Sequence, residues 1–240
     1  MMLKTRMVLA ALLLAAGGCT STRDFTASGY ALPANKPVSI IVLRPDVEVG
    51  SATAGGVAEP NAEWTSAARE NLGAALIDNG RRAGLSVAML PDQDGDAART
   101  LADYEALHRS VASSIAAYKY AQVQLPTKRK RFDWTLGPGA AALGRMGQGG
   151  NYALFVVTRD HFATTGRVAM QIVFAALGGY VPAGQHLAYA SLVDLQSGDV
   201  VWFNVLDGSA GDIRTREGAQ AMVDRLMKSL PRKPGEGPRS

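Results

Sequence analysis

The sequence predicts an α/β fold in which a mixed β-sheet is flanked by amphipathic helices, with one folded domain over residues 37–231. The order of segments supports this, because short apolar runs alternate with longer stretches of helical periodicity in the first half of the domain. The composition supports it too. The 240 residues are 47% hydrophobic and 19% charged, which excludes wholesale disorder. The length suits one domain or two small ones.

Two short strands are predicted in the first half of the domain. Residues 38–43 form a continuous apolar run of mostly β-branched side chains that ends at Arg44, which is typical of a buried central strand. Residues 85–90 form the second strand, which Pro91 closes. Residues 46–62, between the first strand and the first helix, are rich in glycine and are predicted to be a loop.

Two helices follow these strands. Residues 62–83 have apolar side chains at helical spacing, with Asn61 placed to cap the N-terminus and Gly84 the C-terminus. Residues 98–120 form the clearest amphipathic helix of the chain, because six apolar side chains fall three or four residues apart and share one face: Leu101, Tyr104, Leu107, Val111, Ile115 and Tyr118.

The second half is predicted to contain a strand, a hairpin and a closing helix. Residues 152–158 are an apolar strand, and residues 187–195 and 200–206 are two strands joined by a tight turn. Gly198 can adopt the positive φ that such a turn needs. Residues 215–230 have one apolar face and are predicted to be the last helix.

The segment 163–186 is ambiguous. Its apolar part, residues 167–180, is compatible with a short buried helix, a strand or an element that contacts a membrane. It is too short for a helix that spans a bilayer, which needs ~20 residues.

The first 18 residues have the pattern of a secretion signal. Lys4 and Arg6 give a positive start, residues 7–16 are apolar, and small residues follow. The apolar run is well short of the ~20 residues of a membrane-spanning helix, so we expect this segment to be cleaved.

The single cysteine of the chain, Cys19, directly follows this signal. Small residues at 16–18 followed by a cysteine resemble the lipobox of bacterial lipoproteins, with Ala16 in place of the commoner Leu. The resemblance implies that the Cys19 thiol receives a diacylglyceryl group and the new amine an acyl chain, and Thr20 favours the outer membrane. The alternative is an ordinary small residue near a conventional cleavage site. Two or more acyl chains hold a protein stably in a membrane.

The mature chain is predicted to begin with a flexible tether at 19–36 and to end with a disordered polar tail at 232–240. Cleavage removes Lys4 and Arg6, which lowers the 25 basic residues to 23 against 21 acidic ones, a net charge of +2. A charge so close to zero provides no general attraction for nucleic acid, and we expect no nucleic-acid partner.

One basic run is a candidate binding site. Lys128, Arg129, Lys130 and Arg131 lie close to Trp134 in a predicted loop. Lipid headgroups, peptidoglycan carboxylates or an acidic protein surface could bind there. The alternative is a solvated loop.

No motif predicts catalysis, a metal or a cofactor. His108, His161 and His186 lack the close spacing of a local metal clamp. The sequence at 208–211 (GSAG) is one residue short of a nucleophile elbow. The loose dinucleotide pattern at 137–142 follows no apolar strand, so we interpret it as the start of a helix.

The predicted hairpin at 190–202, ASLVDLQSGDVVW, resembles the hairpin of periplasmic lipoproteins related to the curli-secretion lipoprotein and to the amino-terminal domain of the Tol-system β-propeller protein. The resemblance implies a small α/β sandwich. It is strong over about 20 residues and loose over 38–230, and it departs at 121–150 and at 163–186. Trp202 is interpreted as a core residue.

These observations predict a non-catalytic lipoprotein, anchored in the outer membrane and facing the periplasm, that binds an envelope protein or peptidoglycan. One alternative is an envelope hydrolase with a site assembled from Asp160, His161 and Asp194. Another is a structural subunit of a secretion or envelope complex in which residues 163–186 make the oligomer contacts. The oligomeric state is left open.

Overall fold

The computed structural model describes residues 21–27, 30–33, 37–120, 125–128, 131–147, 149–179, 181–182 and 184–231. Its strands are β1 (Ser21–Thr26), β2 (Ser39–Val42), β3 (Asp46–Ala52), β4 (Ala58–Pro60), β5 (Ser86–Met89), β6 (Tyr152–Ala163), β7 (Gln185–Asp194) and β8 (Val200–Asp207). Its helices are α2 (Ala62–Arg82), α3 (Gly95–Tyr120), α4 (Ala141–Met146), α5 (Thr165–Ala176) and α6 (Arg216–Leu226), with short 3-10 turns η1 (Pro126–Lys128) and η2 (Pro138–Ala140).

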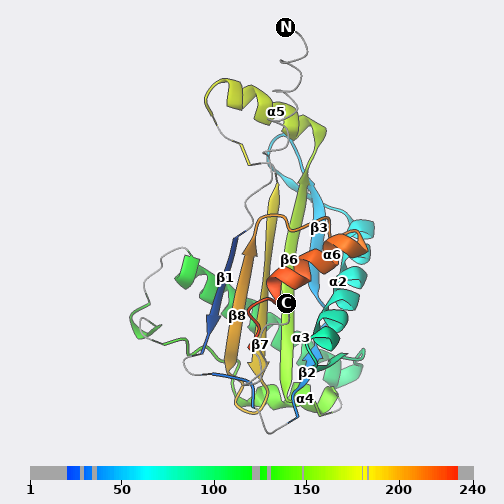
Figure 1. The fold of residues 1–240 in the computed structure, drawn as a ribbon, viewed down its shortest axis with the longest axis vertical. Helices are drawn as coiled ribbons and strands as arrows, with labels where there is room; N and C mark the ends of the chain where they lie inside the picture. Colours follow the sequence, from blue (N-terminus) through cyan, green and yellow to red (C-terminus); the bar gives the residue numbers. More distant parts are fainter. Residues whose placement is uncertain are drawn as a thin grey trace.

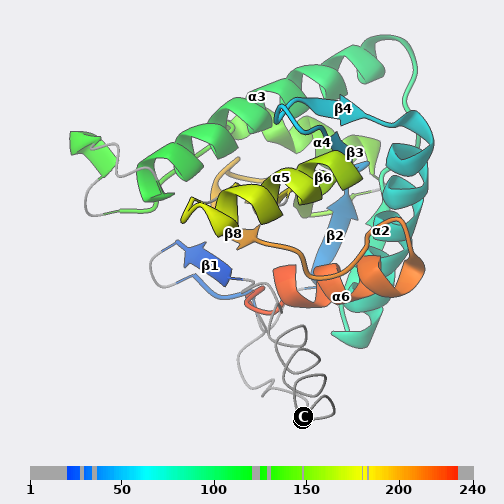
Figure 2. The ribbon, with the colours of Figure 1, turned by 90° about the horizontal axis from the view of Figure 1, so that it is seen from above.

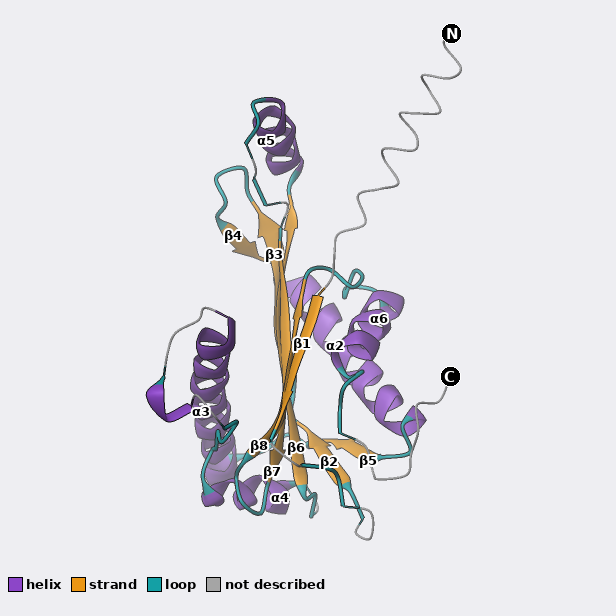
Figure 3. Ribbon diagram, turned by 60° about the vertical axis from the view of Figure 1, so that its left-hand side comes forward, coloured by secondary structure: helices purple, strands orange, loops and turns teal. Residues whose placement is uncertain are grey.

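The predicted mixed α/β fold is confirmed. The strands form one sheet in the order β1-β8-β7-β6-β2-β5, seen face-on in Figure 1. Helices α2 and α6 cover one face, α3 and α4 cover the other, and α5 lies beyond one end of the sheet (Figure 3). Among the described helices, none has both the length and the hydropathy needed to cross a bilayer.

Strand β6 is the centre of the sheet, and one of its edges is shared by two strands. β2 pairs with β6 in parallel through residues 40–42, and β3 then pairs in parallel with the next part of β6 through residues 46–52. Residues 43–45 separate the two strands, and Pro45 lies in this break. On the other edge, β6 pairs antiparallel with β7.

Each face of the sheet has its own hydrophobic core, since side chains alternate between the faces along a strand. In β8, Trp202 is fully buried against the α2 and α6 face, whereas Phe203 is fully buried against the α3 and α4 face. The interpretation of Trp202 as a core residue is confirmed. At the α3 face, Ile115 and Leu143 complete the packing.

The predicted helix ends on α2 are confirmed. The Asn61 side chain accepts a hydrogen bond from the Trp64 N–H at 2.9 Å, which caps the N-terminus. Gly84 follows the C-terminus with φ +70°, a conformation that favours glycine.

The predicted buried face of α3 is wrong at one position. Leu107 is 41% exposed, and His108 is buried in its place. The remaining predicted positions, Leu101, Tyr104, Val111, Ile115 and Tyr118, pack on the core. The polar imidazole can be buried because it finds both an aromatic ring and a hydrogen-bond partner, which are described below.

The segment at 46–62, predicted to be a loop, contains β3 and β4. Val47 and Val49 point into the core while Glu48 and Ser51 are half-buried, an alternation typical of a strand. The glycines at 55 and 56 form the turn between β3 and β4, so the glycine-rich composition belongs to that turn.

The structure also differs from the tether expected at 19–36. Residues 21–26 form β1, which pairs antiparallel with β8 along its whole length, and Leu32 is fully buried. β1 has mostly exposed side chains, so no apolar pattern marks it, and backbone hydrogen bonds to β8 hold it in the sheet. Cys19 and the tail at 232–240 lie outside the described residues.

The hairpin and the closing helix are confirmed. β7 and β8 are joined by a turn in which Gly198 has φ +81° and the Asp194 side chain accepts a hydrogen bond from the Gln196 N–H at 2.8 Å. α6 begins after Thr215, whose hydroxyl accepts from the Gly218 N–H. The ambiguous segment at 167–180 lies largely in the helix α5.

Candidate functional site

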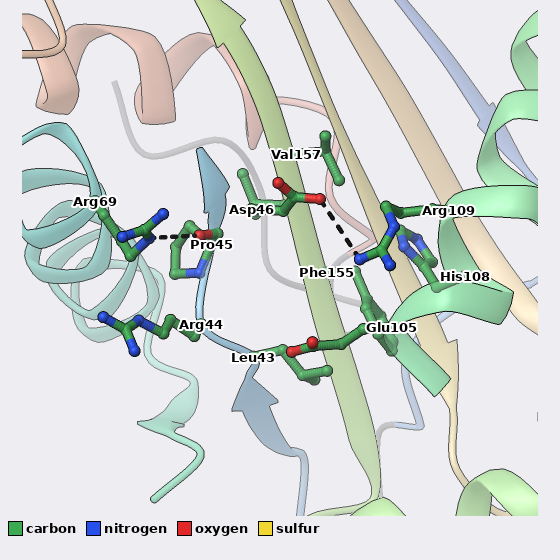
Figure 4. A pocket seen from close by; sticks show the side chains of 11 residues that line it. Leu43, Arg44, Pro45, Asp46, Arg69, Glu105, His108, Arg109, Phe155 and Val157 are labelled. Carbon is green, nitrogen blue, oxygen red and sulfur yellow. Dashed lines mark hydrogen bonds and ion pairs between the residues drawn. The ribbon is translucent and has the colours of Figure 1, made fainter. Parts of the chain in front are cut away.

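A cleft of about 370 Å³ opens at the break between β2 and β3. Its floor is formed by Phe155 and Val157 of β6, and its rim comes from the break itself, from α2 and from α3 (Figure 4). The cleft exists because residues 43–45 interrupt the strand pairing along β6, so side chains of α2 on one face of the sheet and of α3 on the other reach this gap.

Asp46 occupies the centre of the charged groups in this cleft. One carboxylate oxygen lies 3.0 Å from Nη2 of Arg159, and the other lies 3.7 Å from Nη1 of Arg109 on α3. Arg159 also donates to the backbone carbonyl of Asp46 at 3.1 Å. The two arginines therefore neutralise Asp46 and connect β3, β6 and α3.

Two further arginines line the opposite wall. Arg69 of α2 donates from Nε to the carbonyl of Pro45 and from Nη2 to the carbonyl of Val47, both at 3.3 Å, which fixes the backbone of the break. Arg44 is exposed at the mouth, and Figure 4 shows its guanidinium on the same side as Arg69.

Glu105 of α3 is the second acidic group of the cleft. Its half-buried position raises its pKa above the ordinary value, and the positive charge of Arg109 partly opposes this effect. Three arginines and two carboxylates thus line the cleft, with Arg159 behind Asp46.

His108 lies beside these groups and closes the cleft on the α3 side. Its ring stacks on Phe155 with the centroids 4.1 Å apart, and its Nε2 lies 2.8 Å from Oγ of Ser191. Burial, and to a lesser extent the nearby Arg109, lower the pKa of His108 to about 3, so the imidazole is neutral near pH 7. Ser191 is fully buried, which leaves its hydroxyl no access to a substrate.

The arrangement is suited to binding an anionic group. Guanidinium groups form paired, charge-assisted hydrogen bonds with carboxylates and phosphates, and a concave site strengthens such bonds by excluding water. Within the described part of the chain, no three His, Asp or Glu side chains gather into a cluster that could hold a metal ion.

The described residues of the predicted basic run lie away from the cleft: Lys128 ends η1, and Arg131 lies between η1 and η2. Lys128 donates to the carboxylate and the carbonyl of Asp133, both at 2.9 Å, and its Nζ lies 4.9 Å from the centre of the Trp134 ring. Trp134 is 9% exposed and belongs to the α3-side core. Arg131 is exposed, whereas Arg129 and Lys130 lie outside the described residues. A binding role for this run stays a prediction.

The three residues of the hydrolase alternative are not brought together. Asp160 accepts a hydrogen bond from His186 on one face of β6, while His161 lies 3.1 Å from Glu48 on the other face. Asp194 pairs with Tyr152, at the opposite end of β6 from Asp160. A site needs these groups within hydrogen-bond reach of one another, and this geometry does not provide it.

Sequence reasoning missed the cleft because its charged residues come from separate elements with no shared motif. Arg44 and Asp46 flank a proline that directly follows the first predicted strand, and this interruption was the available signal. Arg69, Glu105 and Arg109 stand on helix faces where charged residues are ordinarily solvated.

No family model matches the chain, and no curated protein sequence matches it. Among solved structures, it is similar to the PelC dodecamer from Paraburkholderia phytofirmans, with 12% identity, a TM-score of 0.41 and coverage of 89% of this chain and 99% of that chain. It is also similar to the PelC dodecamer of a single-substitution variant from the same organism, with 13% identity and the same TM-score and coverage. Similarity at this level says nothing of function.

Proposed function

We propose that this chain is a lipid-anchored, non-catalytic binding lipoprotein of the bacterial cell envelope. Cys19 holds it in the outer membrane, the folded domain faces the periplasm, and the cleft at the β2–β3 break binds an anionic group of an envelope component. The observation that carries the anchor is the position of Cys19, directly after a secretion signal and two residues before the first strand of the sheet.

The anchor is tested by metabolic labelling with a palmitate analogue in cells that make the full-length chain. We expect label on the wild-type protein and none on Cys19→Ala. Cell fractionation should recover the labelled protein in the outer-membrane fraction. Equal labelling of Cys19→Ala, or an unmodified thiol in the mass of the mature protein, would contradict the anchor.

The cleft is proposed to take a carboxylate of peptidoglycan. Its volume lies in the range of sites for small ligands, which suits the end of a stem peptide better than the broad face of a protein. Arg44 and Arg109 are both exposed at its mouth and available to a carboxylate, although Arg109 shares its charge with Asp46.

Titration with soluble muropeptides tests this assignment. Arg44→Gln with Arg109→Gln removes two donors from the mouth, and we expect binding to weaken roughly tenfold or more, since a hydrogen bond to a charged group contributes about 1.5–3 kcal/mol. Arg99→Gln is the matched control, because Arg99 lies on the same helix, is 78% exposed and pairs with Asp96 outside the cleft. Equal affinity in all three proteins would rule out the cleft.

A further inference from the structure

Exposed apolar side chains gather at one end of the domain. Of the large hydrophobic residues that are exposed in the described part of the chain, all but Leu107 lie on α5, directly after it, or in the turn between β3 and β4. The most exposed are Leu177 at 79%, Ile172 at 67% and Val57 at 64%. Arg167 of α5 donates to the carbonyl of Thr53 in that turn at 3.2 Å, which joins the two segments into one surface, here called the tip.

The side chains of α5 are arranged in the opposite way to those of an ordinary surface helix, whose apolar face packs on the domain and whose polar face meets solvent. Its polar side chains point inward: Arg167 donates from Nε to the carbonyl of Pro182 at 2.8 Å, and Gln171, one turn later, donates to the carbonyl of Val181 at 3.0 Å. The apolar side chains point outward, and no residue of α5 is buried. Figure 2, seen from above, shows α5 crossing over the end of the sheet.

The tip has almost no charge. Arg167 is the single charged residue between Phe162 and Gln185, and residues 51–58 contain none. The guanidinium of Arg167 is already satisfied by backbone carbonyls. Transfer of this surface into an apolar medium therefore desolvates no carboxylate, which would be the costly step.

The position of the anchor identifies what covers the tip. Ser21, the first residue of β1, lies level with Arg159 of β6, because the register runs from Ser21 to Asp207, from Asp207 to Leu187, and from Leu187 to Arg159. β6 continues beyond this level to Ala163 and leads into α5 (Figures 1 and 3). Ser21, which follows Cys19 by two residues in the sequence, and α5 thus lie toward the same end of the domain.

The distances agree with a bilayer at this end. Four residues of strand from Arg159 to Ala163 rise about 13 Å. Two residues from Ser21 to Cys19 reach at most about 7 Å. With the strands upright on the membrane, the start of α5 therefore lies at least roughly 6 Å farther out than the acylated cysteine, deep enough to reach the ~5–10 Å depth of a helix that lies in the headgroup region.

We propose that the tip inserts into the lipid leaflet that holds the Cys19 anchor, with α5 lying in the plane of the interface. This inference rests on the proposed anchoring. At 12 residues α5 is about 18 Å long, which suits a helix that lies on the bilayer and is too short to cross it. The tip and the acyl chains then fix the orientation of the domain, with both β5 and the β7–β8 turn directed away from the membrane.

Site-specific quenching tests insertion in the acylated full chain. Because Cys19 is the single cysteine and is acylated, Ile172→Cys introduces one free thiol for an environment-sensitive fluorophore. In vesicles of phosphatidylethanolamine and phosphatidylglycerol with brominated acyl chains, we expect a blue-shifted emission and quenching several-fold greater than for Gln196→Cys. Gln196 is the matched control, because it is exposed in the β7–β8 turn at the opposite end of β7.

Equal quenching at the two positions would overturn the proposal. A blue shift at position 172 without lipid quenching would overturn it as well, since it would mean that a second copy of the chain covers α5. The intact mass of the same preparation reports the acyl chains separately, so a failure of the anchor is recognised independently of the behaviour of α5.

A second measurement uses the mature chain made without residues 1–18 and with Cys19→Ser, so that neither the signal segment nor an acyl chain contributes and the tip is the proposed membrane contact. Ile172→Ser with Leu177→Ser is expected to lower the vesicle partition coefficient roughly tenfold or more, because two exposed apolar side chains no longer insert. Leu107→Ser is the control, since Leu107 is exposed on α3 away from the tip and should leave partitioning unchanged. The same partition coefficient in all variants would contradict insertion.

Discussion

His108 and Ser191 form a buried polar pair between α3 and the sheet, with Nε2 of the imidazole 2.8 Å from Oγ of the serine. Both residues are inaccessible, and the pKa of His108 is lowered to about 3 by burial and by Arg109. A histidine held neutral in the folded chain takes up a proton readily only after unfolding. The pair therefore makes the stability of the domain depend on pH.

The free energy of unfolding is expected to fall as the pH drops from 6.5 toward 3. In this window the unfolded chain binds a proton at His108 that the folded chain does not, so acid favours unfolding, and above 6.5 the contribution vanishes. The titration of His108 alone should make the free energy of unfolding about 2 kcal/mol lower at pH 5 than at pH 7. Urea unfolding at the two pH values measures it.

His108→Gln serves as the control, because glutamine keeps a side-chain amide near Ser191 and does not titrate. The difference in stability between pH 5 and pH 7 should be about 2 kcal/mol smaller in this variant than in the wild type. An identical pH dependence in both proteins would show that His108 is not held neutral.

Two glycines of α2 should respond with opposite sign to substitution by alanine. A Cβ on Gly80 would overlap Cγ2 of Val87 in β5, so Gly80→Ala should cost about 1–3 kcal/mol of stability. At Gly73 the nearest atoms belong to Met89 at 3.9 Å, an ordinary contact. Gly73→Ala should stabilise by about 0.5–1 kcal/mol through helix propensity. Urea unfolding distinguishes them, and a shared sign would contradict the packing of α2 on β5.

Gly198 in the β7–β8 turn is expected to tolerate alanine less well than Gly84 after α2. Both have a positive φ, which costs a residue with a Cβ about 1–2 kcal/mol. At Gly84 nothing lies within 4 Å of a new Cβ, whereas at Gly198 it would meet the backbone carbonyl of Gly137. Thermal unfolding should therefore show the larger loss for Gly198→Ala. Comparable losses would mean that the chain around Gly137 does not pack on the turn.

The hydrogen bond between Asp160 and His186 should contribute more to stability than that between His161 and Glu48. Asp160 is buried, so removing His186 leaves a carboxylate without that partner at a cost of about 1–3 kcal/mol. The Glu48 side chain is 41% exposed, and water can replace its partner. Double-mutant cycles with Asp160→Asn and His186→Ala, and with Glu48→Gln and His161→Ala, measure the two coupling energies. A larger coupling for the second pair would contradict this ranking.

Sequence patterns correctly predicted the features that depend on interactions between residues close in the chain, such as helix caps and turns. Asn61 and Gly84 mark the ends of α2, and Gly198 marks the hairpin, because caps and turns depend on a few neighbouring residues. β1 could not be found this way. Its pairing with β8 joins residues far apart in the chain, and its exposed edge position requires no apolar side chains.

The sequence indicated the apolar residues of the tip, but it did not indicate the cleft. The apolar run at 167–180 was visible, but its outward direction follows from the inward bonds of Arg167 and Gln171, which only the folded chain shows. The cleft depends on Arg69, Arg109 and Asp46, which approach one another because α2 and α3 flank the same break. The spacing of these three residues along the sequence does not reveal that they lie close together in the fold.

The pairing of β1 with β8 has a mechanical consequence under the proposed anchoring. β1 starts at the membrane end and runs away from it, so a load that draws the domain from the bilayer acts parallel to the ladder between Ser21 and Thr26. The interstrand bonds lie perpendicular to the strands, and such a load must shear the whole ladder at once instead of peeling it one rung at a time. β1 would thus transmit the tensile load from the acyl chains to the rest of the domain.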